Sequence, residues 1–559
     1  MAVRYESGVA NQSRVPIRIT ARSLLLVSSG VVRKCEKESM MEKFRKRMMK
    51  WGMSAAKVSL AASILALPAM SAQANDFDGL EGYDFGSIVQ RGLERSSLIW
   101  FGVGKPLKDS ALPTTGDYRT PTQPASAQVL LGDGLKAEYV TRTVGHNADQ
   151  FAFWPSDENP THLIFCIEGA PQDLGTFLPG GLIKKFNPSV QRVRLQSGAV
   201  ETILRGMNRC DGIRRTPWGT ILATEEVTDG GAYEILGPLQ VTNHTVADRS
   251  LGTIIDENGF PASAIVKRKA LPVIAFEGLA ILPSGVLVGG DELRPGSPPS
   301  QGGLGSDSDG GAVFKFIPAA QRTTNEPLTD LTQSPFAGGN VYALQVSCLD
   351  STQQFGQGCE VGSGAWVAVS AANARSDAYK AGATGYYRPE DLELDREFKG
   401  EGARFCWTDT QEEVGKGFGE VVCAVDRLPL IADPAQRTVV LNRFVEGDAD
   451  FNSFDNLEFQ PKTGNLYITE DPGTHGNGDV FACLPDGDDR DIKSDGCLKM
   501  ISVKDSSAEP TGFKFSADGR TAYLSIQHSN DGLMPKFDDY ATDDIIKITG
   551  FRIPFRFER

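Results

Sequence analysis

Short runs of β-branched, aromatic and other apolar residues recur from about residue 129 onward, separated by Gly, Pro, Asn and Asp. In four segments, two such runs flank a Gly-containing turn, and the second run leads into acidic or amide residues. These segments are 208–226, 278–292, 456–471 and 512–528. Two β-rich runs joined by a turn are typical of a β-hairpin, so each segment is predicted to form one.

Repeated hairpins in a chain with little helical periodicity predict an all-β fold. Their long, uneven spacing favours a β-propeller over residues 129–559, with insertions between or within blades; a pair of large β-sandwiches is the competing architecture. Residues 75–128 are rich in Pro, Ser, Thr and Gly after Lys105 and are predicted to form an N-terminal arm. The inner strands of a propeller line a central channel, so residues distant in sequence can meet at one mouth.

The N-terminal segment has the pattern of a signal peptide over residues 40–74. Basic residues between Lys43 and Lys50 precede an apolar stretch at 55–70, and an A-x-A pattern ending at Ala74 predicts cleavage before Asn75. The apolar stretch is short for a membrane span. Residues 1–39 are interpreted as an extension upstream of the natural start. We therefore expect an exported protein, periplasmic or extracellular.

Export implies an oxidising compartment in which disulfides persist. Three pairs of cysteines that are close in sequence are predicted to form local disulfides: Cys348/Cys359, Cys406/Cys423 and Cys483/Cys497. Of the cysteines that follow residue 74, Cys166 and Cys210 remain. Either they pair with each other, or Cys210 is a thiolate available to a metal.

Charge and motifs exclude several classes of function. The formal net charge of -14 makes the chain a poor general binder of nucleic acid or anionic membrane. The sequence lacks a phosphate-cradling G-x-x-x-x-G-K-[ST] loop and the G-x-S-x-G elbow of α/β-hydrolases. We expect a small-molecule substrate, no membrane span after signal cleavage, and a monomer by default.

Carboxylates follow several of the predicted strands. The run at 220–224 leads into Glu225 and Glu226, and Cys210 lies shortly before it. Carboxylates suit hard cations, and a thiolate can bind softer or borderline metals. Because these strand ends can converge in a propeller, we expect a multi-metal site.

A set of short motifs occurs in a fixed order along most of the chain. They are C-D-G…T-P-W-G-T…E-E at 210–226, F-E-G at 276–278, G-D-E at 290–292, R-P-E-D at 388–391, F-D-N-L-E-F at 454–459 and E-P-T-G-F-K-F-S-A-D-G-R-T-A-Y-L-S-I-Q-H at 509–528. This ordered set resembles the PhoX family of secreted alkaline phosphatases. The stretch between Cys210 and Thr216 is bulkier than the Gly-rich stretch of the family and one residue longer.

The resemblance implies a six-bladed propeller that hydrolyses phosphate monoesters at a site holding iron and calcium. It implies that Cys210 is an iron ligand, that Glu277 and Glu390 are metal ligands, and that Arg388 binds the substrate phosphate beside Glu390. Further candidates for the same metal cluster are Glu225, Glu226, Asp291, Asp455 and Glu509.

Two other functions compete with a phosphatase. One is a calcium-dependent propeller hydrolase of lactonase-like or phytase-like chemistry, which also gathers acidic side chains at a channel mouth. The other is a non-catalytic, metal-stabilised propeller that binds a partner. A metal-binding thiolate at Cys210 would distinguish the phosphatase from the calcium-dependent hydrolase.

Overall fold

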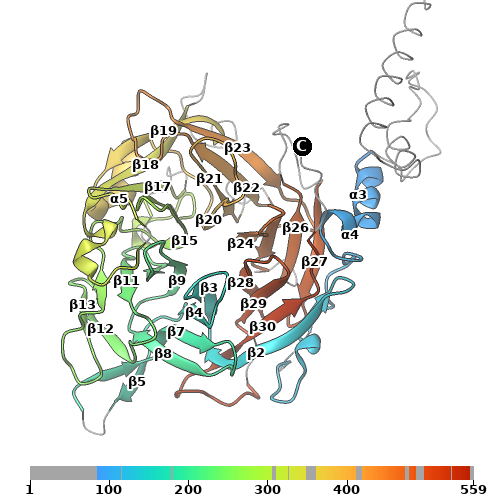
Figure 1. The fold of residues 1–559 in the computed structure, drawn as a ribbon, viewed down its shortest axis with the longest axis horizontal. Coiled ribbons are helices and arrows are strands. Elements are labelled where there is room, and N and C mark those ends of the chain that lie inside the picture. The colour runs from blue at the N-terminus through green and yellow to red at the C-terminus, as the bar shows by residue number, and fades with distance from the viewer. Residues whose placement is uncertain are drawn as a thin grey trace, which may run out of the picture. The chain divides into compact units, whose positions relative to one another are not determined.

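A computed structural model describes residues 85–553, except 115, 117, 178–180, 302, 305–309, 325, 348–359, 411–417, 473–477, 486–495 and 530–531. The predicted upstream extension, the signal peptide, the first residues of the arm and the Cys348/Cys359 pair lie outside the described residues. In the described part, β-sheets are arranged as the blades of a propeller around a central axis (Figure 1).

The first three blades follow one another along the chain and are formed mainly from antiparallel strands; β12 pairs with β8 in parallel. The first contains β3 (Ala148–Trp154), β4 (His162–Ile167), β7 (Pro188–Arg194) and β8 (Val200–Arg205), extended by β12 (His244–Asp248) and β13 (Thr253–Ile255). The second contains β9 (Cys210–Arg215), β10 (Thr220–Glu225), β11 (Ala232–Leu236) and β14 (Ile265–Lys267). The third contains β15 (Phe276–Ile281), β16 (Leu287–Asp291), β17 (Val313–Pro318) and β18 (Gly339–Ser347).

The last three blades follow the same plan. The fourth contains β20 (Pro389–Leu394), β21 (Ala403–Asp409), β22 (Glu420–Asp426) and β23 (Val439–Glu446), and β19 (Gly362–Val369) joins it to the third blade. The fifth contains β24 (Phe454–Phe459), β25 (Leu466–Glu470), β26 (Asp479–Cys483) and β27 (Cys497–Val503). The sixth contains β28 (Glu509–Phe515), β29 (Thr521–Gln527) and β30 (Thr542–Thr549).

The ring closes through a strand that precedes the first blade. Strand β2 (Lys136–Gly145) pairs with β30 as the outer strand of the sixth blade, so the two ends of the propeller sequence share one sheet. The innermost strands contact one another in sequence, and β28 contacts β3. Figure 1 shows β3, β9, β15, β20, β24 and β28 around the centre. The prediction of an all-β, six-bladed propeller is confirmed.

The remaining elements precede the blades or are inserted within or between them. Ahead of the blades are α3 (Phe85–Arg95), α4 (Ser97–Trp100), η1 (Ala125–Ala127) and β1 (Val129–Leu131), which pairs with β27. Inserted between strands of the first blade are β5 (Asp173–Thr176) and β6 (Lys184–Phe186), and between strands of the third blade are η2 (Pro299–Gln301), η3 (Leu331–Gln333) and η4 (Pro335–Ala337). Between β19 and the fourth blade are η6 (Ala371–Asn373) and α5 (Ala374–Lys380). Phe101 and Val103, from the segment predicted as an arm, are buried in a hydrophobic cluster with strands of the fifth and sixth blades.

The four hairpins predicted from the sequence are β9–β10, β15–β16, β24–β25 and β28–β29. Each is the inner pair of strands of its blade. The inner pairs of the first and fourth blades, β3–β4 and β20–β21, were not predicted as hairpins. Longer connections rich in charged residues separate their strands, so the compact turn that identified the other four is absent there.

The inner strands approach one another backbone to backbone. A Cβ atom added to Gly278 on β15 would lie 1.7 Å from the backbone nitrogen of Leu392 on β20. A Cβ atom added to Gly212 on β9 would lie 1.8 Å from the backbone oxygen of Glu277. Glycine therefore permits a close approach that narrows the channel at these two contacts.

We predict that Gly278→Ala lowers the free energy of unfolding by about 1–3 kcal/mol, because the new methyl group overlaps a backbone that cannot move freely. Gly338→Ala is the matched control, since a Cβ atom there meets nothing within 4 Å. Chemical denaturation of both variants measures the effect. Equal denaturation midpoints for the two variants would show that the strands separate without cost.

Candidate metal centre

Five innermost strands carry an acidic residue at their second position. These residues are Asp149 on β3, Asp211 on β9, Glu277 on β15, Glu390 on β20 and Asp455 on β24. Each is at most 7% exposed. The blades repeat the same strand register, so the five side chains belong to the same end of the central channel. Glu509 begins β28, the innermost strand of the sixth blade.

A second row of polar residues immediately follows the second strand of each blade. Its members are Glu168, Glu226, Glu292, Thr410, Asp471 and His528. The last residue of the second strand pairs with a residue at the start of the inner strand in each blade; for example, Ile167 pairs with Ala148 and Glu470 pairs with Phe454. The two rows therefore lie beside each other at one mouth.

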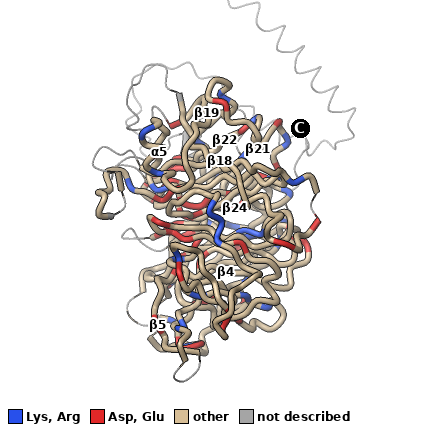
Figure 2. Tube along the Cα trace, turned by 90° about the vertical axis from the view of Figure 1, so that its left-hand side faces the viewer, with Lys and Arg blue, Asp and Glu red and all other residues tan. Residues whose placement is uncertain are grey.

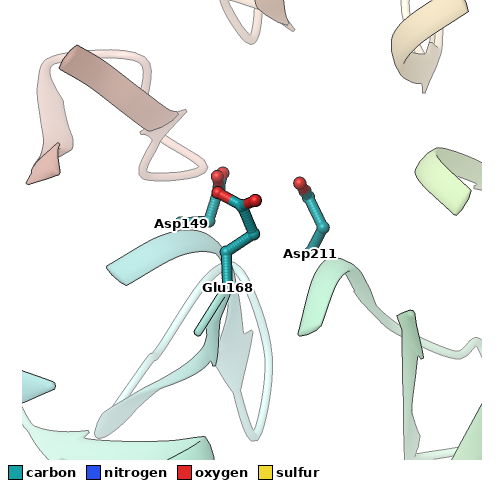
Figure 3. Close-up of side chains that lie close together, drawn as sticks. All are labelled: Asp149, Glu168 and Asp211. Carbon is teal, nitrogen blue, oxygen red and sulfur yellow. The ribbon is translucent and has the colours of Figure 1, made fainter. Parts of the chain in front are cut away.

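The acidic residues of the two rows form three adjoining groups. Within each group, one oxygen from each carboxylate lies within 4.8 Å of the others. The groups are Asp149/Glu168/Asp211, Asp211/Glu226/Glu277 and Glu277/Glu390/Asp455. Figure 3 shows the first group, with its three carboxylates directed toward a common space. Asp211 and Glu277 each belong to two groups, so the three groups form a continuous chain.

The mouth has more carboxylates than cations to balance them. In the edge-on view, Asp and Glu residues gather at mid-height on one side of the propeller (Figure 2). Burial, and then repulsion by neighbouring carboxylates, raises the pKa of Asp211, Glu277 and Asp455 well above their usual range. The same causes raise the pKa of Asp149 to about 7. Bound cations would relieve this repulsion, and a donor set made only of oxygen suits hard metal ions.

Arg388 lies at the edge of the third group. Its Nη2 is 2.9 Å from Glu390 Oε1, and its Nε donates to Glu292 Oε1. Thr410 Oγ1 also donates to Glu390 Oε1. Burial raises the pKa of Glu390 to about 8, against the opposing effect of Arg388. The guanidinium is thus held in one orientation beside the carboxylates.

A buried layer of hydrogen bonds holds the acidic residues from below. Gln150 Nε2 donates to Asp211 Oδ1 at 3.2 Å, and Arg214 Nη1 donates to Gln150 Oε1 at 2.5 Å. Arg214 Nη2 donates to Asp391 Oδ1 at 2.6 Å. Thr511 Oγ1 donates to Asp149 Oδ1 at 2.5 Å. These contacts link β3, β9, β20 and β28 beneath the mouth and fix the orientation of two candidate ligands.

The structure does not present Cys210 as the free thiolate that an iron ligand requires. Cys210 forms a disulfide with Cys166, and a disulfide sulfur carries no thiolate charge with which to bind a metal. Asp211, one residue later, is the residue of this blade that joins the carboxylate groups. Adjacent strand residues point to opposite faces, so a shift of one residue exchanges the side chain that reaches the mouth.

Two of the predicted metal ligands, Glu225 and Asp291, point elsewhere. Glu225 accepts hydrogen bonds from Arg249 and from the backbone nitrogen of Asn208, and Asp291 pairs with Arg375. Neither belongs to the three carboxylate groups. In each case the following residue, Glu226 or Glu292, lies at the mouth instead, for the same reason of alternation.

The structure brings four predicted ligands into the groups: Glu226, Glu277, Glu390 and Asp455. Glu509 lies nearby, at the start of β28, where it pairs with Gln527. Burial, and then the charges of Asp471, Asp455 and Asp149, raise its pKa. Sequence reasoning missed Asp149, Glu168 and Asp211. A search for an acid at the start of every apolar run would have identified Asp149 and Asp211.

Two predicted local disulfides, Cys406–Cys423 and Cys483–Cys497, are present. Each joins cysteines paired across neighbouring antiparallel strands.

No helix in the described part of the chain has the length and hydropathy of a membrane span.

Comparison with known proteins identifies a family for part of the chain. The family model of alkaline phosphatase PhoX matches residues 303–530, which confirms the resemblance seen in the sequence. The structure of Pseudomonas fluorescens PhoX in complex with vanadate, a transition state analogue, aligns with a TM-score of 0.50 at 16% identity, covering 79% of this chain and 97% of that one. This similarity establishes a shared fold.

Two other solved propellers align less closely. The gluconolactonase XC5397 from Xanthomonas campestris gives a TM-score of 0.35 at 12% identity, covering 79% of this chain and 99% of that one. The PQQ-bound aldose sugar dehydrogenase from Streptomyces coelicolor gives 0.34 at 10% identity, covering 74% and 98%. Comparison with curated proteins gives no match.

We predict that the chelator-treated protein loses stability as pH rises. The pKa of Glu390 is about 8 and that of Asp149 about 7 in the folded state, against about 4 in the unfolded chain. The unfolded chain releases these protons first, so the free energy of unfolding falls between about pH 4 and pH 8. Thermal unfolding across this range, with and without excess calcium, measures the slope.

Glu390→Gln provides the control for this pH dependence, because it removes one of the titrating groups and should flatten the slope. Calcium should also flatten it, since bound cations keep the carboxylates ionised. If the midpoint temperature of thermal unfolding in chelator did not change with pH, or rose with pH, the mouth would not carry the excess of carboxylates inferred here.

Proposed function

We propose that this chain is a metal-dependent phosphatase that hydrolyses phosphate monoesters at the mouth of its propeller channel. The observation that carries the proposal is the chain of three carboxylate groups joined through Asp211 and Glu277, with Arg388 beside the third. The PhoX family match includes Arg388, Glu390 and Asp455. The fold shared with Pseudomonas fluorescens PhoX supports the same reading.

The proposed cofactors are calcium and iron. The residues fit hard cations, because all their donor atoms are carboxylate oxygens and their mutual repulsion is strong. Since Cys210 is in a disulfide, iron would have to be held by carboxylates in its ferric form, which is also a hard acid. Cations held there would supply charge neutralisation for the phosphate and activation of a water molecule.

The chain's own residues prepare the site for a phosphate dianion. Arg388 would bind nonbridging phosphate oxygens, and its orientation is set by Glu292 and Glu390 before substrate arrives. Glu390 would hold a cation while Thr410 and Arg388 fix its carboxylate. The buried position of the carboxylates limits their contact with bulk water, which strengthens the electrostatic interactions that substrate experiences.

The proposed location is outside the cytoplasm, in the periplasm or the extracellular space. The disulfides Cys166–Cys210, Cys406–Cys423 and Cys483–Cys497 support it, because such bonds persist in oxidising compartments. The signal peptide predicted at residues 40–74 is consistent with export of a chain that begins at Asn75.

Metal content and turnover, measured on the same sample, test the proposal. The chain from Asn75 is loaded with calcium and ferric iron, analysed for bound metals and assayed with a chromogenic phosphomonoester. We predict that Glu277→Gln, which removes a carboxylate shared by two groups, lowers bound metal and reduces kcat at least about tenfold. Protein that binds metal and is inactive on every phosphomonoester would contradict the phosphatase proposal.

Glu226 and Glu225 provide a matched pair for this experiment. Glu226→Gln should lower metal content, because Glu226 belongs to the second group. Glu225→Gln should leave metal content unchanged and lower thermal stability instead, since it weakens the pairing of Arg249. Loss of metal in both variants alike would show that the groups are not the binding site.

A further inference from the structure

Arg209 occupies the same place in the second blade that Arg388 occupies in the fourth. Each arginine stands two residues before the acid of its inner strand, Asp211 or Glu390. Both adopt left-handed backbone conformations, with φ of 52° at Arg209 and 54° at Arg388. Residues other than glycine rarely adopt this conformation. Its repetition shows that the same backbone geometry ahead of the inner strand orients both side chains.

A line of charged side chains connects the two arginines along the mouth. Arg209 Nη1 lies 3.1 Å from Glu168 Oε1 and 3.3 Å from Glu226 Oε2. Glu226 shares a hydrogen bond with Glu292, which in turn accepts from Arg388 Nε. The two guanidinium groups therefore stand at opposite ends of one carboxyl pair, Glu226 and Glu292, which belongs to or adjoins the second and third carboxylate groups.

Arg209 is the more accessible of the two arginines. Its side chain is 49% exposed, whereas that of Arg388 is 15% exposed. Its backbone is held in place, because the backbone oxygen of Arg209 accepts a hydrogen bond from the backbone nitrogen of Glu226 at 2.8 Å. Its ion pairs with Glu168 and Glu226 both use Nη1.

We propose that Arg209 is a second phosphate-binding residue, and that Arg209 and Arg388 grip the dianionic phosphate of the substrate from opposite sides. This inference rests on the proposed phosphatase function and adds a specificity to it. A monoester dianion offers three nonbridging oxygens to two guanidinium groups. A diester offers two oxygens and a single charge, and its second ester group occupies the position of one hydrogen-bond acceptor. Arg209 thus favours monoesters over diesters.

The test compares Arg209→Ala, Arg209→Lys and Arg520→Ala with the unsubstituted protein. Arg520 lies exposed in the β28–β29 turn, at the opposite end of the blade from Glu509, and provides a control with the same change of charge. We expect Arg209→Ala to raise KM for p-nitrophenyl phosphate at least about tenfold, as loss of a charged hydrogen bond implies. KM for bis(p-nitrophenyl) phosphate should change less than about twofold, since it lacks the third oxygen.

Binding of inorganic phosphate to the metal-loaded proteins, measured by calorimetry, gives a readout independent of turnover. Arg209→Ala should weaken phosphate binding by a similar factor, Arg209→Lys should restore part of it, and Arg520→Ala should have no effect. Elemental analysis of each variant checks that metal content is retained.

The outcomes separate this inference from the proposed function. Normal turnover with phosphate binding and KM unchanged in Arg209→Ala overturns the role of Arg209 and leaves the phosphatase intact. Phosphate binding that depends on Arg209 in a protein inactive on esters supports the clamp and overturns the phosphatase. Loss of metal in Arg209→Ala, with metal and phosphate binding fully normal in Arg209→Lys, shows that Arg209 only supports the carboxylates and overturns the clamp.

Discussion

Uncompensated negative charge at one end of the channel is the constraint on which this structure depends. Five inner strands each deliver a buried carboxylate to the same mouth, and a second row adds Glu168, Glu226, Glu292 and Asp471. Carboxylates buried together resist ionisation unless cations accompany them. The propeller holds them there because its inner strands are in backbone contact, with Gly278 at the tightest point. The apolar core around the ring thus holds these carboxylates close together against their mutual repulsion. Bound cations would relieve that repulsion.

The hydrogen-bonded residues beneath the mouth orient the carboxylates, and the arginines on its rim contact the carboxylates from outside. Gln150, Arg214 and Thr511 hold Asp211 and Asp149 from below, so the first group keeps its geometry. Arg388 and Arg209 lie to either side of the carboxyl pair formed by Glu226 and Glu292. Cations would hold the substrate from within the ring, and the arginines would hold it from the rim. Bound cations would therefore neutralise the charge of the substrate, and the two arginines would orient it.

The sequence predicted the fold class and part of the site, and its errors have identifiable physical causes. Compact turns identified the inner hairpins of four blades, and motif order pointed to Glu277, Glu390 and Asp455. Cys210, Glu225 and Asp291 were each displaced by one residue from the side chain that reaches the mouth, because side chains alternate along a strand and the inner strands carry bulges. Asp149 and Glu168 were missed because their blade lacked a compact turn. The closure of the ring by β2 joins distant segments, which local patterns cannot reveal.

The most direct test of the central claim is a crystal structure of the metal-loaded protein, with anomalous difference maps recorded at wavelengths that distinguish calcium from iron. We predict neighbouring peaks in all three carboxylate groups, with Asp211 and Glu277 each contacting two of the bound ions. Maps without peaks among these residues would contradict it, as would a single isolated ion that leaves Asp211 or Glu277 without a metal contact.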